Sequence, residues 1–223
     1  GSIGDVAVAP SNPNVIYVGS GEGLQRPDLS VGDGMYKSTD AGKTWIHLGL
    51  KDVQQIGGLD IDPKNENRVF VAALGHPYGP NTQRGVFRTL DGGLTWEKVL
   101  FKDENTGAIQ VTIDPNNPQI VFCALWAGRQ GPWENGAWDG KESGLFMSED
   151  GGTTWEKVIS GLPTTAQGLG RIGFCIAKSD SKRMYATVDA GREGGIYRSD
   201  DAGESWRRIQ TDERYWGRGD DFA

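Results

Sequence analysis

One nine-residue stretch, KSTDAGKTW at residues 37–45, recurs three times further along the chain. The other copies are RTLDGGLTW (88–96), MSEDGGTTW (147–155) and RSDDAGESW (198–206). All four share a hydroxyl residue, then Asp, then Gly, then a second hydroxyl residue followed by Trp. The Asp residues, at positions 40, 91, 150 and 201, follow one another at steps of 51, 59 and 51 residues. Repeats of this period are typical of proteins built from stacked copies of one unit.

The segments around each motif repeat as well. A segment with apolar residues at alternate positions precedes the motif (34–38 in the first copy), and another follows it (45–48). Two more lie upstream, and a Pro- and Asn-rich turn such as PSNPN (10–14) joins them. Period-two alternation bounded by turn residues is typical of antiparallel strands. Each unit is therefore predicted to be a four-stranded antiparallel meander.

A single meander of this size cannot bury both of its faces, and radial stacking of several meanders solves this in β-propellers. The sequence therefore predicts an all-β fold, a β-propeller of four four-stranded antiparallel blades. The expected blades are residues 5–50, 57–101, 108–160 and 171–210. We interpret residues 211–223 as a connector to a missing blade, so the chain is expected to be part of a larger propeller.

Composition supports this fold class and excludes some functions. The 223 residues include 34 Gly and 8 Trp, which suits many short strands and turns. No apolar run approaches the roughly 20 residues that cross a bilayer. The net charge of −7 argues against nonspecific binding of nucleic acid. His47 and His76 lie far apart, so we expect no metal and no cofactor. For Cys123 and Cys175 the sequence favours buried free thiols and leaves a disulfide between them as the alternative.

The repeated motif has a structural explanation. Its carboxylate and hydroxyl groups can accept hydrogen bonds from turn N–H groups, its Gly allows a positive φ, and its Trp can bury a large ring between sheets. A calcium loop is the alternative, but such a loop needs successive carboxylates and a terminal Glu that the motif lacks. The residues given this structural role are Ser38, Asp40, Gly42, Trp45, Thr89, Asp91, Gly93, Trp96, Ser148, Asp150, Gly152, Trp155, Ser199, Asp201, Gly203 and Trp206.

This motif is similar to the Asp-box, also called the bacterial neuraminidase repeat. With GMYKSTDAGKTW (34–45) and DVAVAPSNPNVIYVGSGEG (5–23), it makes the chain resemble Asp-box β-propellers. These include sortilin-type receptors, sialidases, xyloglucan-degrading glycosidases and photosystem II assembly factors. The resemblance is greatest to secreted bacterial proteins that are sortilin-like or glycosyl hydrolase-like, and it implies a secreted or periplasmic location. Because the Asp-box is structural, it specifies a fold and not a function.

The long, irregular loops are predicted to lie together on one face of the propeller. They are 19–34, 74–85, 126–144 and 188–195, together with the connectors between blades. Aromatic residues among carboxylates and arginines suit a groove for a sugar or a peptide, although the Trp rings could instead pack their own loops. The candidate ligand-binding residues are Glu22, Arg26, Asp28, Asp33, His76, Tyr78, Arg84, Trp126, Arg129, Trp133, Glu134, Trp138, Asp139 and Glu142.

These loops favour a noncatalytic binding module that recognises a peptide, a protein or a glycan. The first alternative is part of a xyloglucanase-like glycoside hydrolase, which would need two carboxyl groups facing each other across a cleft. The second is an assembly factor for a larger complex. A sialidase is disfavoured, because the nearest match to that family's Arg-Ile-Pro string is Arg171-Ile172-Gly173 in mid-chain. No catalytic residue is assigned.

The two outermost blades are expected to expose apolar faces. Burying such faces is favourable, so the sequence predicts association through the terminal blades. The partner would be a second copy or the remainder of a longer chain.

Overall fold

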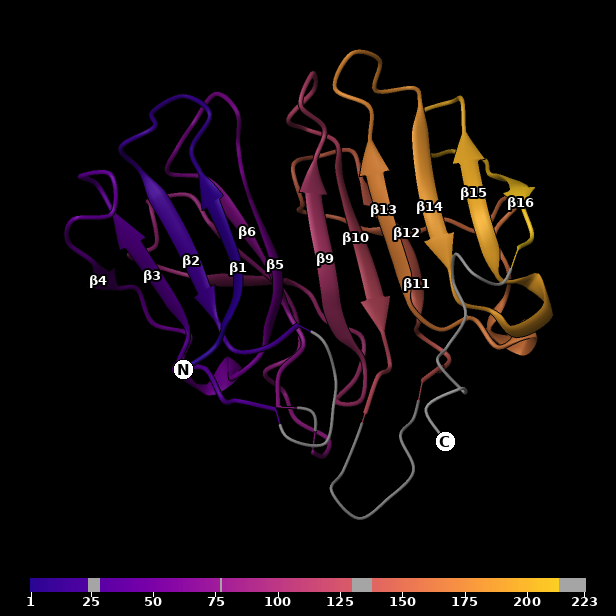
Figure 1. The fold of residues 1–223 in the computed structure, drawn as a ribbon, viewed down its shortest axis with the longest axis horizontal. Coiled ribbons are helices and arrows are strands. Elements are labelled where there is room, and N and C mark those ends of the chain that lie inside the picture. The colour runs from indigo at the N-terminus through magenta and orange to yellow at the C-terminus, as the bar shows by residue number, and fades with distance from the viewer. Residues whose placement is uncertain (24–28, 77, 130–137, 213–223) are drawn as a thin grey trace.

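The computed structural model describes residues 1–23, 29–76, 78–129 and 138–212. Within these ranges the chain forms sixteen β-strands and three 3-10 helices of three residues each, and the strands assemble into four sheets (Figure 1). None of the helices in the described ranges is long and apolar enough to cross a membrane.

Each sheet is an antiparallel meander of four strands in chain order. The first contains β1 (Ile3–Val8), β2 (Ile16–Ser20), β3 (Met35–Ser38) and β4 (Ile46–His47). The second contains β5 (Ile56–Ile61), β6 (Val69–Ala73), β7 (Gly85–Thr89) and β8 (Glu97–Leu100). The third contains β9 (Gly107–Ile113), β10 (Val121–Trp126), β11 (Gly144–Ser148) and β12 (Glu156–Lys157). The fourth contains β13 (Ile172–Ile176), β14 (Met184–Val188), β15 (Gly195–Ser199) and β16 (Arg207–Gln210).

The predicted fold class, four four-stranded antiparallel blades of a propeller, is therefore confirmed. Most of the predicted connector, residues 213–223, lies outside the described residues. The 3-10 helices occupy links between strands: η1 (Lys51–Val53), η2 (Thr165–Gln167) and η3 (Gly191–Glu193).

The core lies between neighbouring sheets, and the central strands show this most clearly. All five residues of β6 and all six of β10 are buried, because these strands have sheets on both sides. Phe122 of β10, for example, packs edge-on against Phe174 of the fourth sheet, with 6.1 Å between ring centroids. β1, in contrast, exposes Val6 by 56% and Val8 by 51%. This is the apolar face predicted for a terminal blade; association through it stays a prediction.

The two cysteines differ. Cys123 is buried and free, as predicted. The prediction for Cys175 is wrong in one respect, because this free thiol is exposed. It follows the buried Phe174 in β13 and points to the opposite face of the strand, where the described part of the chain places no further sheet.

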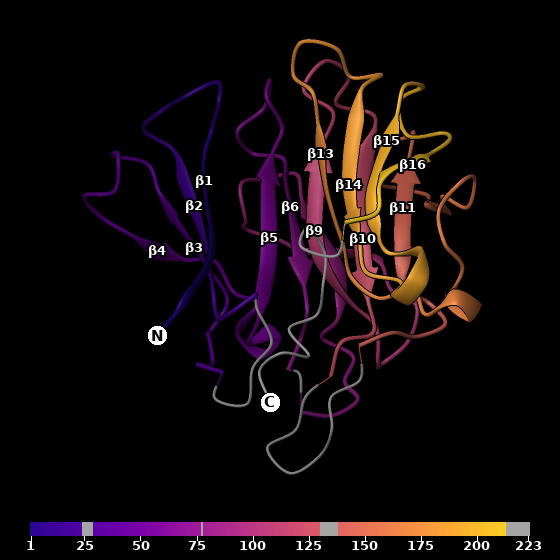
Figure 2. The ribbon, with the colours of Figure 1, turned by 45° about the vertical axis from the view of Figure 1, so that its right-hand side comes forward.

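The first strands of the sheets lie side by side at the inner edge of the array (Figure 2). β1 contacts β5, and β5 contacts β9, while β13 follows beside β9 and β10. The long loops and the connectors meet at one end of the sheets, as three backbone hydrogen bonds show. Gly32 N donates to Gln54 O (2.8 Å), Asn81 N to Glu104 O (2.9 Å) and Gly170 N to Asp189 O (2.7 Å).

Candidate ligand-binding site

The four repeated turns satisfy their own hydrogen bonds. In the first turn Ser38 Oγ donates to Asp40 Oδ1 (2.8 Å) and accepts from Gly42 N (2.8 Å). Thr44 donates to the same Asp40 carboxylate through its N–H (2.8 Å) and its hydroxyl (2.7 Å). These bonds, those from the Thr44 hydroxyl foremost, lower the pKa of Asp40 to about 2. The equivalent bonds also hold the pKa of Asp91, Asp150 and Asp201 below the ordinary range.

The Trp residues of these turns are buried unequally, which corrects the expectation that every ring lies between sheets. Trp206 is 4% exposed, whereas Trp45 is 43% exposed. The backbone N–H of Trp206 donates to Ser160 O of the third sheet's exit segment (3.0 Å), so its turn has a preceding sheet to pack on. Trp96 likewise donates its ring N–H to Leu48 O, at the end of the first sheet (2.8 Å). Trp45 belongs to the first sheet and has no such neighbour among the described residues.

Three polar side chains tie the inner strands together. Asp5 Oδ2 accepts from Leu59 N of the next sheet (2.8 Å), and Asp60 Oδ2 accepts from Ile113 N of the sheet after that (2.7 Å). Gln110 continues the pattern with two bonds to the backbone of Phe174, one to its N–H (3.1 Å) and one to its carbonyl (2.6 Å). An edge strand would otherwise present unpaired backbone groups, so these side chains satisfy the edges and join the sheets.

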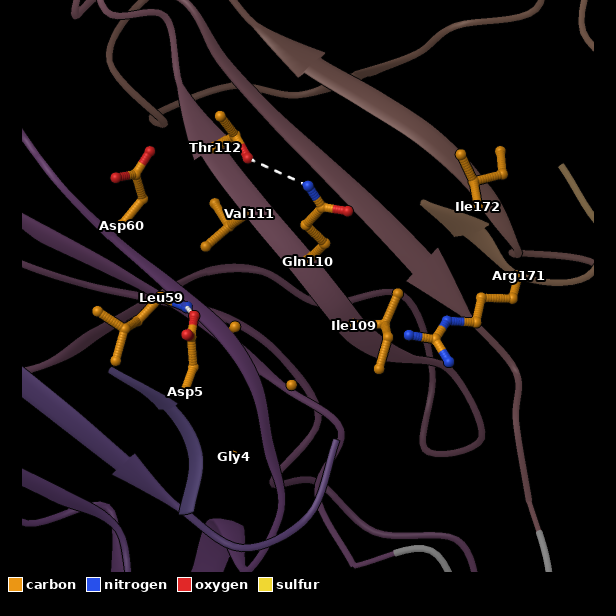
Figure 3. Close-up of a pocket in the computed structure, with 12 residues that line it drawn as sticks. Gly4, Asp5, Leu59, Asp60, Ile109, Gln110, Val111, Thr112, Arg171 and Ile172 are labelled. Carbon is orange, nitrogen blue, oxygen red and sulfur yellow. Dashed lines mark hydrogen bonds between the residues drawn. The ribbon is translucent and has the colours of Figure 1, made fainter. Parts of the chain in front are cut away.

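These inner strands line a cavity of about 430 Å³, drawn in Figure 3. Its lining comes from β1, β5 and β9 and from the start of β13. A second cavity, of about 670 Å³, shares Gly4, Gly57 and Arg171 with the first and reaches Glu22. Volumes of this size suit a small ligand. The two glycines are required for packing, because a Cβ at Gly4 would lie 2.0 Å from Ile56 O and one at Gly57 would lie 2.6 Å from Ile109 O.

Arg171 lies between the two cavities, immediately before β13. Figure 3 shows its guanidinium group beside Ile109, across the cavity from Asp5 and Asp60. The side chain is half-buried, and burial lowers its pKa. Its Cζ lies 5.8 Å from the centroid of the Trp126 ring, a cation–π contact.

Trp126 is itself held firmly. It is 4% exposed, and its ring N–H donates to Trp138 O (2.8 Å). The two rings stack with 6.0 Å between centroids and 22° between planes. The ring also packs on the backbone at Gly128, where a Cβ would lie 2.7 Å from it. The structure thus brings two candidate residues, Trp126 and Trp138, together with Arg171.

Glu22 belongs to this site as well, since it lines the larger cavity with Arg171. Its Oε1 accepts from Ser2 Oγ (2.8 Å) and more weakly from Ser30 N (3.4 Å).

Other candidates lie apart from the cavities. Asp33 contacts the outer strands of the first sheet. Its carboxylate accepts a hydrogen bond from the hydroxyl of Tyr36 in β3 (2.7 Å), and this bond lowers the pKa of Asp33. Its backbone carbonyl contacts the His47 ring of β4 (2.7 Å). Asp139 is exposed, and Glu142 lies 3.8 Å from the exposed Lys141. These three carboxylates do not converge on one another in any described cavity.

The loop between β6 and β7 is organised by Arg84. This side chain is fully buried and donates through Nη2 to His76 O (3.1 Å). Its pKa is lowered to about 10, mainly by burial and to a lesser extent by the charge of Arg129, while Asp103 acts in the opposite direction. Burial also lowers the pKa of His76. Tyr78, at the loop tip, is 42% exposed. The candidates Arg26, Asp28, Trp133 and Glu134 lie outside the described residues.

Arg171, Asp5, Asp60 and Gln110 were not among the predicted site residues. A signal for the last three exists in the sequence, because each is a polar residue inside an otherwise apolar inner strand. Among the described residues, no group of three His, Cys, Asp or Glu side chains is placed to hold a metal.

Comparison with known proteins agrees with this architecture. Residues 33–158, more than half of the chain, match the family model described as sortilin, neurotensin receptor 3. The chain belongs to the Sortilin-Vps10 family.

Two curated relatives of this Sortilin-Vps10 chain are xyloglucanases. The oligoxyloglucan-reducing end-specific xyloglucanase of Emericella nidulans is 37% identical over 229 residues, covering 97% of this chain and 25% of the relative. The xyloglucanase Xgh74A of Acetivibrio thermocellus is 26% identical over 229 residues, covering 88% of this chain and 25% of the relative. The chain thus spans about a quarter of the length of these relatives.

Solved structures show the same fold. An ancestral GH74 enzyme superimposes with a TM-score of 0.70 at 23% identity, over 97% of this chain and 25% of that structure.

Proposed function

We propose that this chain is a glycan-binding part of a glycoside hydrolase of the xyloglucanase kind. The observation that carries the proposal is its similarity to xyloglucanases along almost its entire length, at 37% identity to one of them. The similarity favours the glycoside hydrolase alternative over the noncatalytic binding module of a sortilin-like protein that the loops of the sequence favour. Since the chain corresponds to a quarter of such an enzyme, we assign it binding of the polysaccharide and not the whole reaction.

The carboxylates of the inner cavity support this division of roles. Asp5 and Asp60 both line it, and burial raises the pKa of Asp60 to about 6. A glycosidase pair would need one carboxyl group to protonate the leaving oxygen and the other to act on water or the sugar. Here each carboxylate accepts two backbone N–H bonds: Asp5 from Val6 and Leu59, and Asp60 from residues 61 and 113. In each case one bond comes from the next residue of the same strand, and the other, from Leu59 or Ile113, joins the carboxylate to the neighbouring sheet.

Trp138 supports carbohydrate binding, because this partly buried ring stacks on the buried Trp126, which contacts Arg171 of both cavities, and the apolar face of a sugar packs well on an aromatic ring beside polar groups. A polymeric polysaccharide is met outside the cell, so we also propose a secreted location.

A second candidate function is a peptide- or protein-binding module of the sortilin kind, favoured by the family match. The two candidates differ in what the cavity would hold, and one set of titrations separates them.

The test is calorimetric titration of the chain with xyloglucan oligosaccharides, cello-oligosaccharides and a peptide library. We expect xyloglucan fragments to bind, and Trp138→Ala to weaken binding about three- to ten-fold through loss of an aromatic contact. Trp45→Ala is the matched control, since Trp45 lies in the turn after β3 and lines neither cavity, and it should leave the affinity unchanged. Peptide binding without glycan binding would establish the second candidate. Release of reducing sugar by the chain alone would show that it is catalytic.

A further inference from the structure

We propose that Arg171 makes the inner cavity a site for a carboxylate-bearing sugar, a uronic acid residue of an acidic glycan. The inference rests on the proposed glycan-binding function and adds an acidic sugar to the neutral glycans expected there.

The charge of Arg171 lacks a counter-charge of its own. In the described part of the chain its guanidinium group makes no hydrogen bond and no ion pair; the stacking contact with Trp126 is its one recorded interaction. Burial lowers its pKa. A half-buried cation without a partner is costly, and binding an anion there recovers part of that cost.

The guanidinium group is also positioned in advance. The backbone of residues 170 and 171 pairs with Asp189, since Gly170 N donates to Asp189 O (2.7 Å) and Asp189 N donates to Arg171 O (3.0 Å). Trp126 supports the side chain and is fixed by Trp138. A planar group held in this way can bind a carboxylate through two parallel N–H bonds, the geometry in which arginine is most selective.

The rest of the cavity favours a sugar over a phosphate or a simple anion. Asp5, Asp60 and Gln110 line it on the other side, and carboxylate and amide oxygens can each accept more than one hydrogen bond. Hydroxyl groups of a sugar can donate to them. The same two carboxylates would repel a doubly charged phosphate group more strongly than the single carboxylate that one uronic acid residue carries. The cavity therefore suits one sugar residue that combines a single carboxylate with several hydroxyl donors.

The test compares three glycan probes of similar size, namely a trigalacturonate, its methyl ester and a neutral xyloglucan oligosaccharide, with a short peptide that has a free C-terminal carboxylate and with the amide of that peptide. Each is titrated calorimetrically into the wild-type chain and into Arg171→Met, Arg171→Lys and Arg192→Met. Arg192 is exposed on η3 and lies outside both cavities, so Arg192→Met is the control for a change of net charge.

We expect trigalacturonate to bind the wild type at least ten-fold more tightly than its methyl ester does, with an affinity that falls as salt rises. Arg171→Met should remove this difference, Arg171→Lys should restore part of it, and Arg192→Met should leave it intact. If thermal melting shows that Arg171→Met does not fold, the inference is tested by comparing the affinities of the wild-type chain for trigalacturonate and for its methyl ester.

Equal binding of acid and ester, or trigalacturonate binding that survives Arg171→Met, would overturn the inference. Binding of the neutral oligosaccharide alone would overturn it too and would leave the proposed function standing. If neither glycan binds and a peptide with a free C-terminal carboxylate does, while its amide does not, both the sugar assignment and the proposed function fail.

Discussion

The repeated turns and the inner strands both use Asp side chains to bind backbone N–H groups, but over very different separations along the chain. In the turns the acceptor and the donor are four residues apart, as in Asp40 and Thr44 N. In the inner strands Asp5 and Leu59 N are 54 residues apart, and Asp60 and Ile113 N are 53 apart. The turn bonds form within one hairpin, whereas the inner bonds exist only when neighbouring sheets have docked.

The turns are the feature that all four repeats share, whereas the polar side chains of the inner strands differ from repeat to repeat. Every turn uses the same residue types, so the turns are interchangeable and structural. The inner strands carry Asp5, Asp60 and Gln110 at positions that do not repeat strictly, and they lead to Arg171 in the fourth unit. Ligand recognition is more consistent with the part of the molecule that varies between units.

Removal of an inner tie should have the largest effect on stability. Asp60→Ala leaves the N–H groups of Ile61 and Ile113 without their acceptor, and both residues are buried. Each unpaired buried donor costs about 1–3 kcal/mol, so the two together predict a loss of about 2–6 kcal/mol of unfolding free energy. Asp60→Asn keeps one acceptor oxygen, which can serve one of these two N–H groups, and should therefore cost less than Asp60→Ala. Denaturant melts measure both; equal losses would show that the carboxylate acts through its charge alone.

The pH dependence of stability should also distinguish the two regions. The folded pKa of Asp60 is raised to about 6, so its contribution is fully present below its unfolded pKa of 3.8 and is lost as pH rises through 6. The effect amounts to at most about 3 kcal/mol, since one pKa unit corresponds to 1.36 kcal/mol. The lowered pKa values of the turn carboxylates have the opposite sign, and their stabilisation is lost as pH falls through the folded values.

Comparison with Asp60→Asn isolates the pH-dependent part of the stability that Asp60 contributes, because the amide side chain does not titrate. Between pH 4 and pH 7 the wild type should lose stability relative to this variant. Parallel profiles for the two proteins would contradict the assignment of the raised pKa to Asp60.

The same contrast explains what the sequence could predict. The hairpin turns and the four-stranded sheets follow from local patterns, since the motif and the alternation both act within a few residues. The stacking of Arg171 on Trp126 joins residues 45 positions apart in two sheets, and no local pattern indicates it. The unequal burial of Trp45 and Trp206 escaped prediction for a related reason: it depends on the presence of a neighbouring sheet.

A single turn carboxylate should matter less than an inner tie. Asp150 accepts from Thr153 N, Thr154 N and the hydroxyls of Ser148 and Thr154. Asp150→Ala should lower the melting midpoint by a few degrees, as expected for loss of local bonds in a domain of this size. Glu149→Ala is the matched control, because this neighbouring carboxylate is exposed and, in contrast to Asp150, is not the acceptor of the turn hydrogen bonds. An equal fall in both variants would mean that net charge, and not the hydrogen bonds, is responsible.

The smallest effect should come from the backbone of the turns. Ala202 has φ 60° and Ala41 has φ 59°, while the equivalent residues Gly92 and Gly151 have φ 77° and 74°. A left-handed conformation costs a non-Gly residue about 1–2 kcal/mol, and Gly costs about 0.5–1 kcal/mol in unfolded-state entropy. Ala202→Gly should therefore stabilise the protein by about 0.5 kcal/mol, a rise of roughly 1–2 °C in the melting midpoint. Ala41→Gly should act in the same direction, and a fall in both variants would show that the turn relieves the strain at alanine by other means.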